Sequence, residues 1–184
     1  MEALDFAYQF ASTYLDQSSG TEEIPLVHPE FGGRNGARPE VHRLFSNTQE
    51  LEYLASWLRK RAEAGISFRQ MAVLCRFNKQ VEKMREGLAQ KGIAVDSDQF
   101  NSQRTKAFDP AEDTVKILTM HSSKGLEFNS VAISDLGCMP CAKATPEEEA
   151  RLLYVAMTRS TESMLITYHS ESQFTKQCEA LQQR

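Results

Sequence analysis

The 184-residue chain has little cysteine and no long hydrophobic run, and each absence excludes a class of protein. Its four cysteines are too few and too irregularly spaced for a disulfide framework, which favours a reducing compartment. No apolar stretch approaches the roughly 20 residues that cross a bilayer. The first residues carry acids, Glu2 and Asp5, where a secretory signal carries bases. We therefore expect an intracellular, cytoplasmic protein with no membrane partner.

Positive charge is also scarce, because the formal net charge is −4 at pH 7. The surface as a whole therefore does not indicate nucleic-acid binding. The charges are unevenly distributed, however. Residues 1–30 contain six acids and no Lys or Arg, whereas residues 76–91 contain five Lys or Arg and two Glu. Any phosphate-binding face is expected to be local.

A metal site is not expected, although Cys138 and Cys141 have CxxC spacing around Pro140. A closed structural zinc site usually has four ligands, and the sequence contains no second pair of this kind.

Periodicity predicts helices alternating with short apolar strands. Asn47, with Glu50 three residues later, is typical of a helix start, and Gly65 of its end. The segments 18–40 and 96–113, rich in turn-forming or polar residues, are expected to be loops. Helices are expected over about 3–17, over 47–65, over a pattern that runs through 81–88 and stops at 92, from 145 to about 158–159, and over 171–182. Strands are expected over 41–45, 71–75, 93–95, 115–120, 129–136 and 164–168.

Several of these strands are almost continuously apolar, as strands buried on both faces are. The pattern predicts an α/β fold with a parallel sheet covered by helices on both faces. Ligands in such folds bind beyond the carboxyl ends of the strands. The stretch TMHSSKGLEF, residues 119–128, directly follows a predicted strand and is therefore a candidate site.

The side chains of this stretch suit two kinds of ligand group. Thr119, His121 and Ser122 are small hydrogen-bonding groups of the kind that contact phosphate oxygens. Glu127 is an acceptor, which suits a sugar hydroxyl and repels phosphate. The alternative is an ordinary connection in which Gly125 forms a turn, Glu127 is solvated and His121 is a polar cap.

A second candidate stretch is EEEARLLYVAMTRS, residues 147–160, a predicted helix with a buried stripe through Leu152, Val155 and Ala156. Arg159 lies at its carboxyl end. It could complement the helix dipole, or it could act as an arginine finger that stabilises charge on a transferring phosphoryl group.

Together, and in this order, the two stretches resemble motifs V and VI of superfamily 1 DNA helicases of the UvrD/Rep type. Residues 71–95 resemble the segment that precedes these motifs. The resemblance covers about 71–168 well and 1–70 loosely, and it implies a single domain over 1–184. The implied fold is a RecA-like three-layer sandwich with a mostly parallel sheet, the second, C-terminal motor domain of such a helicase.

The resemblance also implies roles for nucleotide-binding residues. Glu127 would take the ribose hydroxyl of ATP, and Gly125 would allow close backbone approach. Arg159 would reach the γ-phosphate from the other side of a cleft between two motor domains.

Further roles implied by the resemblance concern single-stranded DNA. Thr119, His121 and Ser122 would face its backbone. Arg76, after the 71–75 strand, is a weaker candidate for a nucleic-acid or interdomain contact, and an exposed, solvated arginine is the alternative.

The chain departs from the complete helicase pattern. It contains no G-x-x-x-x-G-K-[ST] sequence and no acidic Walker B strand, so ATP and Mg would be bound mainly by a separate N-terminal RecA-like domain. Where many relatives insert a large domain, this chain has only residues 101–113. We expect no ATP hydrolysis by this chain alone.

Two other functions remain open. The first is a non-catalytic, helicase-like adaptor that binds proteins, although such a scaffold would need neither Arg159 nor Glu127. The second is a small enzyme that uses His121 and a serine as base and nucleophile. This second function is disfavoured because His121 and Ser122 are adjacent and would point apart, and no acid is placed to orient the imidazole.

Overall fold

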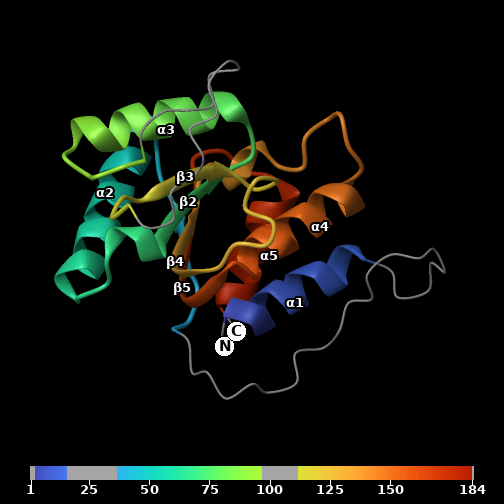
Figure 1. Ribbon diagram of the computed structural model, residues 1–184. Coiled ribbons are helices and arrows are strands. Elements are labelled where there is room, and N and C mark those ends of the chain that lie inside the picture. The colour runs from blue at the N-terminus through green and yellow to red at the C-terminus, as the bar shows by residue number, and fades with distance from the viewer. Residues whose placement is uncertain (1–2, 16–36, 97–111, 184) are drawn as a thin grey trace.

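Five parallel strands form the centre of the molecule (Figure 1). The computed structural model describes residues 3–15, 37–96 and 112–183. The strands lie in the order β1-β5-β4-β2-β3, and every neighbouring pair is parallel, so all carboxyl ends lie at one edge of the sheet. The predicted α/β class with a parallel sheet is confirmed. The strands are β1 (Glu40–Arg43), β2 (Met71–Cys75), β3 (Lys116–Thr119), β4 (Phe128–Ile133) and β5 (Ser160–Tyr168).

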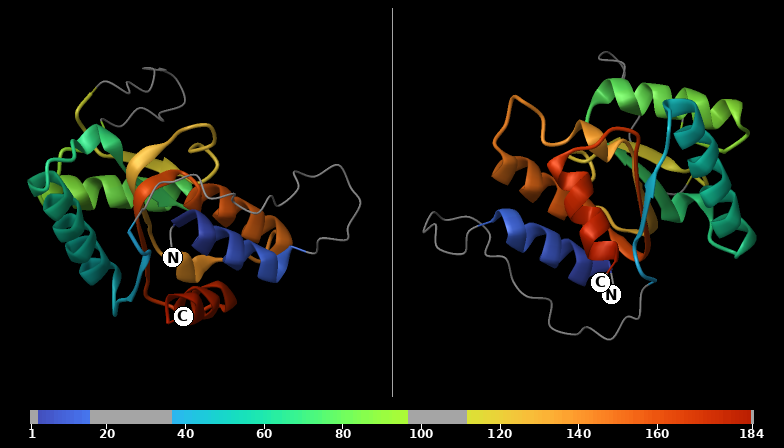
Figure 2. Two further views of the ribbon diagram at one scale, coloured as in Figure 1. Left: turned by 90° about the horizontal axis from the view of Figure 1, so that it is seen from below. Right: turned by 180° about the vertical axis from the view of Figure 1, so that it is seen from behind.

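Helices cover both faces of this sheet (Figures 1 and 2). Helices α2 and α3 lie on one face, and α1, α4 and α5 lie on the other. Each face has its own buried apolar cluster. The predicted three-layer sandwich is therefore confirmed. The helices are α1 (Ala3–Tyr14), α2 (Asn47–Glu63), α3 (Asn78–Gln90), α4 (Pro146–Met157) and α5 (Gln173–Gln182).

Strand β2 shows why the apolar runs predicted a doubly covered sheet. All five of its residues are buried. Ala72 and Leu74 belong to the cluster under α1, α4 and α5, whereas Met71, Val73 and Cys75 belong to the cluster under α2 and α3. Successive side chains of a strand point to opposite faces, so a strand between two helical layers is apolar at every position.

Two predicted strands differ from those observed. In the predicted strand 93–95 only Val95 pairs, as an isolated bridge to Val115. The carboxylate of the next residue, Asp96, accepts the N–H of Ile117. In a longer strand pairing, this N–H would donate to a backbone carbonyl instead. The predicted strand 129–136 ends at Ile133, because Asp135 adopts a left-handed backbone conformation with φ of 51°.

The start of α2 also differs from the prediction. Its N-cap is Ser46, whose side chain accepts the N–H of Gln49, and not Asn47. Glu50, predicted as a capping residue, is instead 2% exposed and faces the end of the sheet. In α4 the buried stripe runs through Leu153 and Ala156 among others, whereas Leu152 and Val155 are only partly buried.

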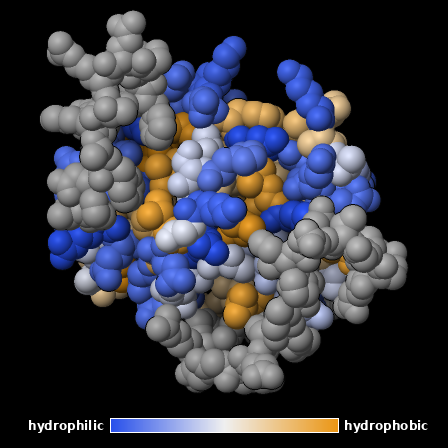
Figure 3. Space-filling model, turned by 45° about the vertical axis from the view of Figure 1, so that its right-hand side comes forward, coloured by the Kyte–Doolittle hydropathy of each residue, from blue (hydrophilic) through white to orange (hydrophobic). Residues whose placement is uncertain are grey.

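On the face shown in Figure 3, the visible apolar side chains form several areas separated by hydrophilic side chains. In the described part of the chain, no helix combines the length and apolarity that spanning a bilayer requires. The predicted loops 18–40 and 96–113 lie largely outside the described residues.

Candidate nucleotide and nucleic-acid sites

The stretch 119–128 connects the two opposite edges of the sheet. It leaves β3 after Thr119 at the carboxyl edge and enters β4 at Phe128 at the amino edge. Thr119 pairs with Cys75 of β2, whereas Ser130 of β4 pairs with Met71. Thr119 and Phe128 therefore differ by six residues along the strand direction, or about 20 Å at roughly 3.3 Å per residue. Only the first half of the stretch therefore lies at the carboxyl edge, where ligands of parallel sheets bind.

The first half brings the predicted DNA-binding residues together. The Thr119 hydroxyl accepts the N–H of Ser122 at 3.1 Å and lies 2.8 Å from the Ser122 hydroxyl. His121 and Ser122 are exposed. A pocket of about 120 Å³ lies between β3 and the start of α3, and its lining includes Thr119, Ser122 and Asn78. Hydroxyl and amide groups of this kind suit phosphate oxygens.

The turn after His121 is fixed by the chain itself. Ser123 is fully buried, and its hydroxyl donates to the Met120 carbonyl at 2.7 Å, so its role is structural. Gly125 has φ of +83°, a conformation that side chains with a Cβ rarely adopt. A Cβ built there meets nothing within 4 Å, so the backbone conformation, and not crowding, requires the glycine.

The second half approaches the other predicted motif at the amino edge. The Arg159 carbonyl accepts the N–H of Phe128 at 2.9 Å, and the Arg159 Nη1 donates to the Leu126 carbonyl at 3.1 Å. Arg159 also donates from Nε to the Val155 carbonyl and from Nη2 to the Thr158 hydroxyl, each at 3.0 Å. Two segments separated by 33 residues thus meet here. Leu126 directly precedes the exposed Glu127.

Arg159 keeps hydrogen-bonding capacity. A guanidinium has five N–H groups, and three of them donate to the described residues. The side chain is half-buried. Within the described ranges the other two N–H groups donate to no protein acceptor, and the guanidinium keeps its positive charge.

Arg76 is held within the protein. Its guanidinium donates to the Glu149 carboxylate from Nε at 3.0 and 3.1 Å and from Nη2 at 2.6 Å. Glu149 is 2% exposed, and the hydrogen bonds to it raise the pKa of Arg76. The alternative of an exposed, solvated arginine is wrong, because Arg76 ties the end of β2 to the first turns of α4.

The local basic segment 76–91 has fewer exposed cations than its sequence suggested. Arg76 and Arg85 form ion pairs with acidic side chains and are largely buried. Lys79 and Lys83 on α3 are exposed. Among the described residues of this segment, phosphate attraction therefore rests on few exposed charges.

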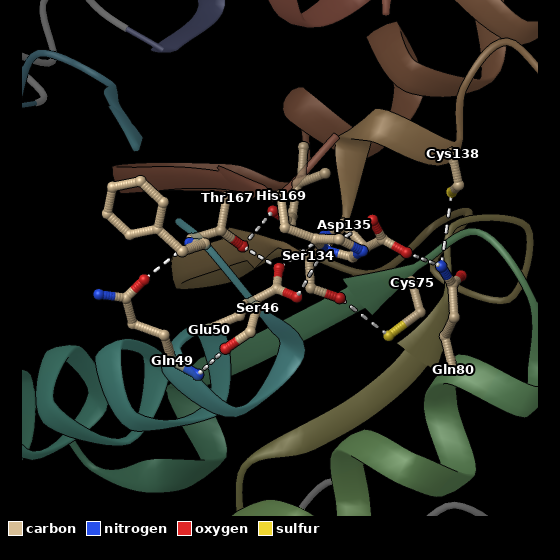
Figure 4. Close-up of polar contacts among 12 residues, drawn as sticks. Ser46, Gln49, Glu50, Cys75, Gln80, Ser134, Asp135, Cys138, Thr167 and His169 are labelled. Carbon is tan, nitrogen blue, oxygen red and sulfur yellow. Dashed lines mark hydrogen bonds and ion pairs between the residues drawn. The ribbon is translucent and has the colours of Figure 1, made fainter. Parts of the chain in front are cut away.

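Sequence reasoning missed a buried polar cluster at the carboxyl edge, shown in Figure 4. The Glu50 Oε1 accepts the Asp135 N–H at 2.7 Å and the Thr167 hydroxyl at 2.5 Å. The His169 Nδ1 lies 3.3 Å from Asp135 and 3.8 Å from Glu50. Burial raises the pKa of both carboxyl groups above their ordinary values. A signal existed, since Glu50 precedes Leu54 by four residues and so lies on the apolar face of its helix.

Gln80 extends this cluster to α3. Its Nε2 donates to the Asp135 carboxylate at 2.7 Å and to the Cys138 sulfur at 3.4 Å, while its Oε1 accepts the Phe77 N–H at 2.9 Å. The cluster therefore joins the start of α2, the ends of β4 and β5, and the first turn of α3.

The cysteines of the CxxC segment lie in this region. The Cys138 sulfur accepts from Gln80, and the Cys141 sulfur lies 4.0 Å from the Arg76 Nη2. Burial raises the pKa of Cys138 to about 11. Within the ranges that the structure describes, no group of three or more His, Cys, Asp or Glu could hold a metal ion.

Comparisons with known proteins concern the family and the fold of the chain. Residues 95–171 match the family described as the UvrD-like helicase C-terminal domain. The chain is 44% identical over 63 residues to an ATP-dependent DNA helicase Rep of Buchnera aphidicola, covering 31% of this chain and 10% of that protein. It is 39% identical over 67 residues to DNA helicase II of Escherichia coli, covering 33% and 9%. The matched segments thus span about a tenth of these relatives.

A solved structure extends the fold comparison to almost the whole chain. The C-terminal domain of a possible DNA helicase from Lactobacillus plantarum WCFS1 superposes with a TM-score of 0.66 at 18% identity, covering 98% of this chain and 95% of that one. At this identity the likeness concerns the fold alone. The resemblance to C-terminal domains of UvrD/Rep-type helicases, including the RecA-like fold, is confirmed.

Proposed function

Because the chain carries a UvrD/Rep-type helicase C-terminal domain, we propose that it acts as the second motor domain of an ATP-dependent DNA helicase or translocase. The observation that supports this most is the 3.1 Å hydrogen bond from Arg159 to the Leu126 carbonyl. This bond supports the proposal because Leu126 directly precedes Glu127, the proposed ribose contact.

The proposed nucleotide contacts lie at the amino edge. Glu127 accepts hydrogen bonds from ribose, and Arg159 stabilises charge developing on the transferring phosphoryl group with its two remaining N–H groups. These residues fit only the outer part of ATP, because the chain has no phosphate-binding loop. Mg and most of the triphosphate would be held by an N-terminal RecA-like domain.

The proposed single-stranded DNA contacts lie at the carboxyl edge. Thr119, His121 and Ser122 face the DNA backbone there, about 20 Å from the nucleotide contacts along the strand direction. We assign Arg76 the bracing of this edge and not a DNA contact, because Glu149 engages its guanidinium. Closure of two motor domains around ATP would then move this edge along the DNA.

A second candidate function is the non-catalytic adaptor. One observation favours it: three N–H groups of Arg159 bond to this chain, which a purely structural arginine would also do. The two functions differ in what happens when Arg159 is replaced in a complete motor.

The decisive experiment joins this chain to the N-terminal motor domain of a Rep-type helicase and measures DNA-stimulated ATP hydrolysis. We expect Arg159→Ala to lower turnover at least about 1,000-fold, with DNA affinity nearly unchanged. Arg159→Lys should restore little, since lysine lacks the planar guanidinium. Arg43→Ala, which removes an exposed arginine, is the control. Turnover of Arg159→Ala within threefold of the parent would favour the adaptor.

A second experiment tests DNA contact in the chain itself. Binding of a fluorescent oligo-dT is measured by anisotropy at two salt concentrations. The double change His121→Ala and Ser122→Ala should weaken binding about tenfold, the effect of two hydrogen bonds. Ser12→Ala, an exposed position on α1, should change nothing. Equal affinities for all three proteins would remove these residues from the DNA site.

A further inference from the structure

Phe77 is an aromatic side chain that the fold leaves 39% exposed, two residues after the fully buried strand β2. Single exposed apolar side chains are common and need no function. This one, however, is fixed on two sides and lies beside the proposed DNA contacts. Those two properties together suggest a use.

The ring and backbone of Phe77 are both braced. The Arg76 guanidinium carbon lies over the ring, 4.8 Å from its centroid, and Arg76 is itself held by Glu149. The Phe77 N–H donates to Gln80, which the buried cluster of Figure 4 holds through Asp135. A ring held in advance loses little conformational entropy when a ligand stacks on it.

The strand register places Phe77 near the pocket between β3 and α3, although Phe77 itself does not line it. Cys75 of β2 pairs with Thr119 of β3, and the Met120 N–H donates to the Cys75 carbonyl at 2.9 Å. Phe77 and His121 are thus each two residues beyond a paired position on neighbouring strands. Asn78, the next residue, lines the same pocket as Thr119.

Phe45 provides a contrast within the same chain. It follows β1, is 91% exposed, and its N–H donates to the Gln49 side chain at 2.7 Å. Strands β5 and β4 separate β1 from β2, so the two strands are about 14 Å apart at roughly 4.8 Å per strand. Phe45 therefore shares the exposure and the backbone hydrogen bond of Phe77, but it does not adjoin the pocket.

We propose that Phe77 is a base-stacking platform for single-stranded nucleic acid. Arg76 covers one face of the ring, so the base stacks on the opposite face while its backbone contacts Thr119 and Ser122. The alternation of polar donors with an aromatic face is the arrangement by which proteins bind single strands without reading their sequence. This inference rests on the proposed DNA-binding function and adds to it a hydrophobic contact outside the two helicase motifs.

The experiment measures oligo-dT affinity and its salt dependence for the whole chain. Phe77→Ala should weaken binding about 5- to 150-fold, the range for loss of one stacked base. The slope of affinity against salt should stay unchanged, because no phosphate contact is lost. Phe77→Tyr should keep wild-type affinity, and Phe45→Ala is the matched control. Urea unfolding of each variant confirms that it is folded.

A spectroscopic signal separates stacking from indirect effects. An oligonucleotide carrying 2-aminopurine changes fluorescence when that base stacks on an aromatic ring. We expect the change with the wild type, Phe77→Tyr and Phe45→Ala, and its loss with Phe77→Ala. Salt-dependent binding that is equal in wild type and Phe77→Ala would overturn the stacking role and leave the DNA-binding function intact. No salt-dependent binding by the wild type would overturn both.

Discussion

The two edges of the sheet hold an arginine in opposite ways. At the carboxyl edge, Arg76 is neutralised by the buried carboxylate of Glu149. At the amino edge, Arg159 bonds, among the described residues, only to carbonyl and hydroxyl oxygens. Neutral acceptors orient a guanidinium and leave its charge in place. A carboxylate orients the guanidinium and also cancels its charge. The comparison teaches that an arginine's partners, more than its exposure, decide whether its charge remains for a ligand.

The largest stability effect is expected from breaking the neutralised pair. Glu149→Ala leaves Arg76 without its partner in a mostly buried place and should lower the free energy of unfolding by about 3–5 kcal/mol. Urea unfolding measures this. The matched control is Glu171→Ala, which breaks the exposed pair with Arg43 and should cost less than about 1 kcal/mol. Equal costs for the two variants would mean that the carboxyl edge is not braced by this pair.

A smaller effect is expected at Gly125, on the way to the amino edge. Gly125→Ala should cost about 1–2 kcal/mol, because alanine must adopt a left-handed conformation without any clash to relieve. Gly125→Asn should cost less, since asparagine tolerates this conformation better. Thermal unfolding of the two variants tests this order. If alanine were the better tolerated, the turn would have a different conformation from the one described.

The start of α2 should show an effect of about 1 kcal/mol. Ser46→Ala removes the side chain that caps Gln49, whereas Asn47→Ala removes the cap that the sequence suggested. We expect the first change to destabilise the protein by about 1 kcal/mol and the second by a few tenths. Parallel chemical denaturation curves would decide, and the reverse order would restore Asn47 as the cap.

The last expected effect is a change in the free energy of unfolding with pH. Burial raises the pKa of Glu50 above its ordinary value, so the folded state binds its proton more readily than the unfolded state. The stability contribution of this group therefore falls as pH rises from its unfolded pKa through the raised folded pKa. Glu50→Gln cannot ionise, so its stability relative to the wild type should increase over that range. Glu52→Gln, which replaces an exposed carboxylate on the same helix, is the control.

Much of this architecture could be predicted from the chain itself. Unbroken apolar runs such as 71–75 indicate strands that are buried on both faces, and a 3.6-residue period of apolar positions predicted the helices. The start of α2 was ambiguous because Ser46 and Asn47 are both good caps. Beyond the bridge at Val95, the side chain of Asp96 accepts the N–H of Ile117, a contact between residues 21 positions apart that no local pattern reveals.

The sequence motifs suggested candidate site residues but not how these residues are arranged in space. The motifs supplied Thr119, His121, Glu127 and Arg159, but not the edge of the sheet at which each lies. That division depends on the pairing register, a non-local property. Arg76 and Glu149 are 73 positions apart in the chain, so the local sequence around neither residue predicts their ion pair.

The eight residues between β3 and β4 also set a mechanical limit. Nine residue steps from Thr119 to Phe128 could extend to about 30 Å, yet they cover a rise of only about 20 Å. The coiled turn that begins with the hydrogen bond from the Ser123 N–H to the Thr119 carbonyl takes up the difference. Pulling the two ends of this connection apart would therefore unwind the turn before it strained either strand, and shortening the connection by several residues would leave it taut.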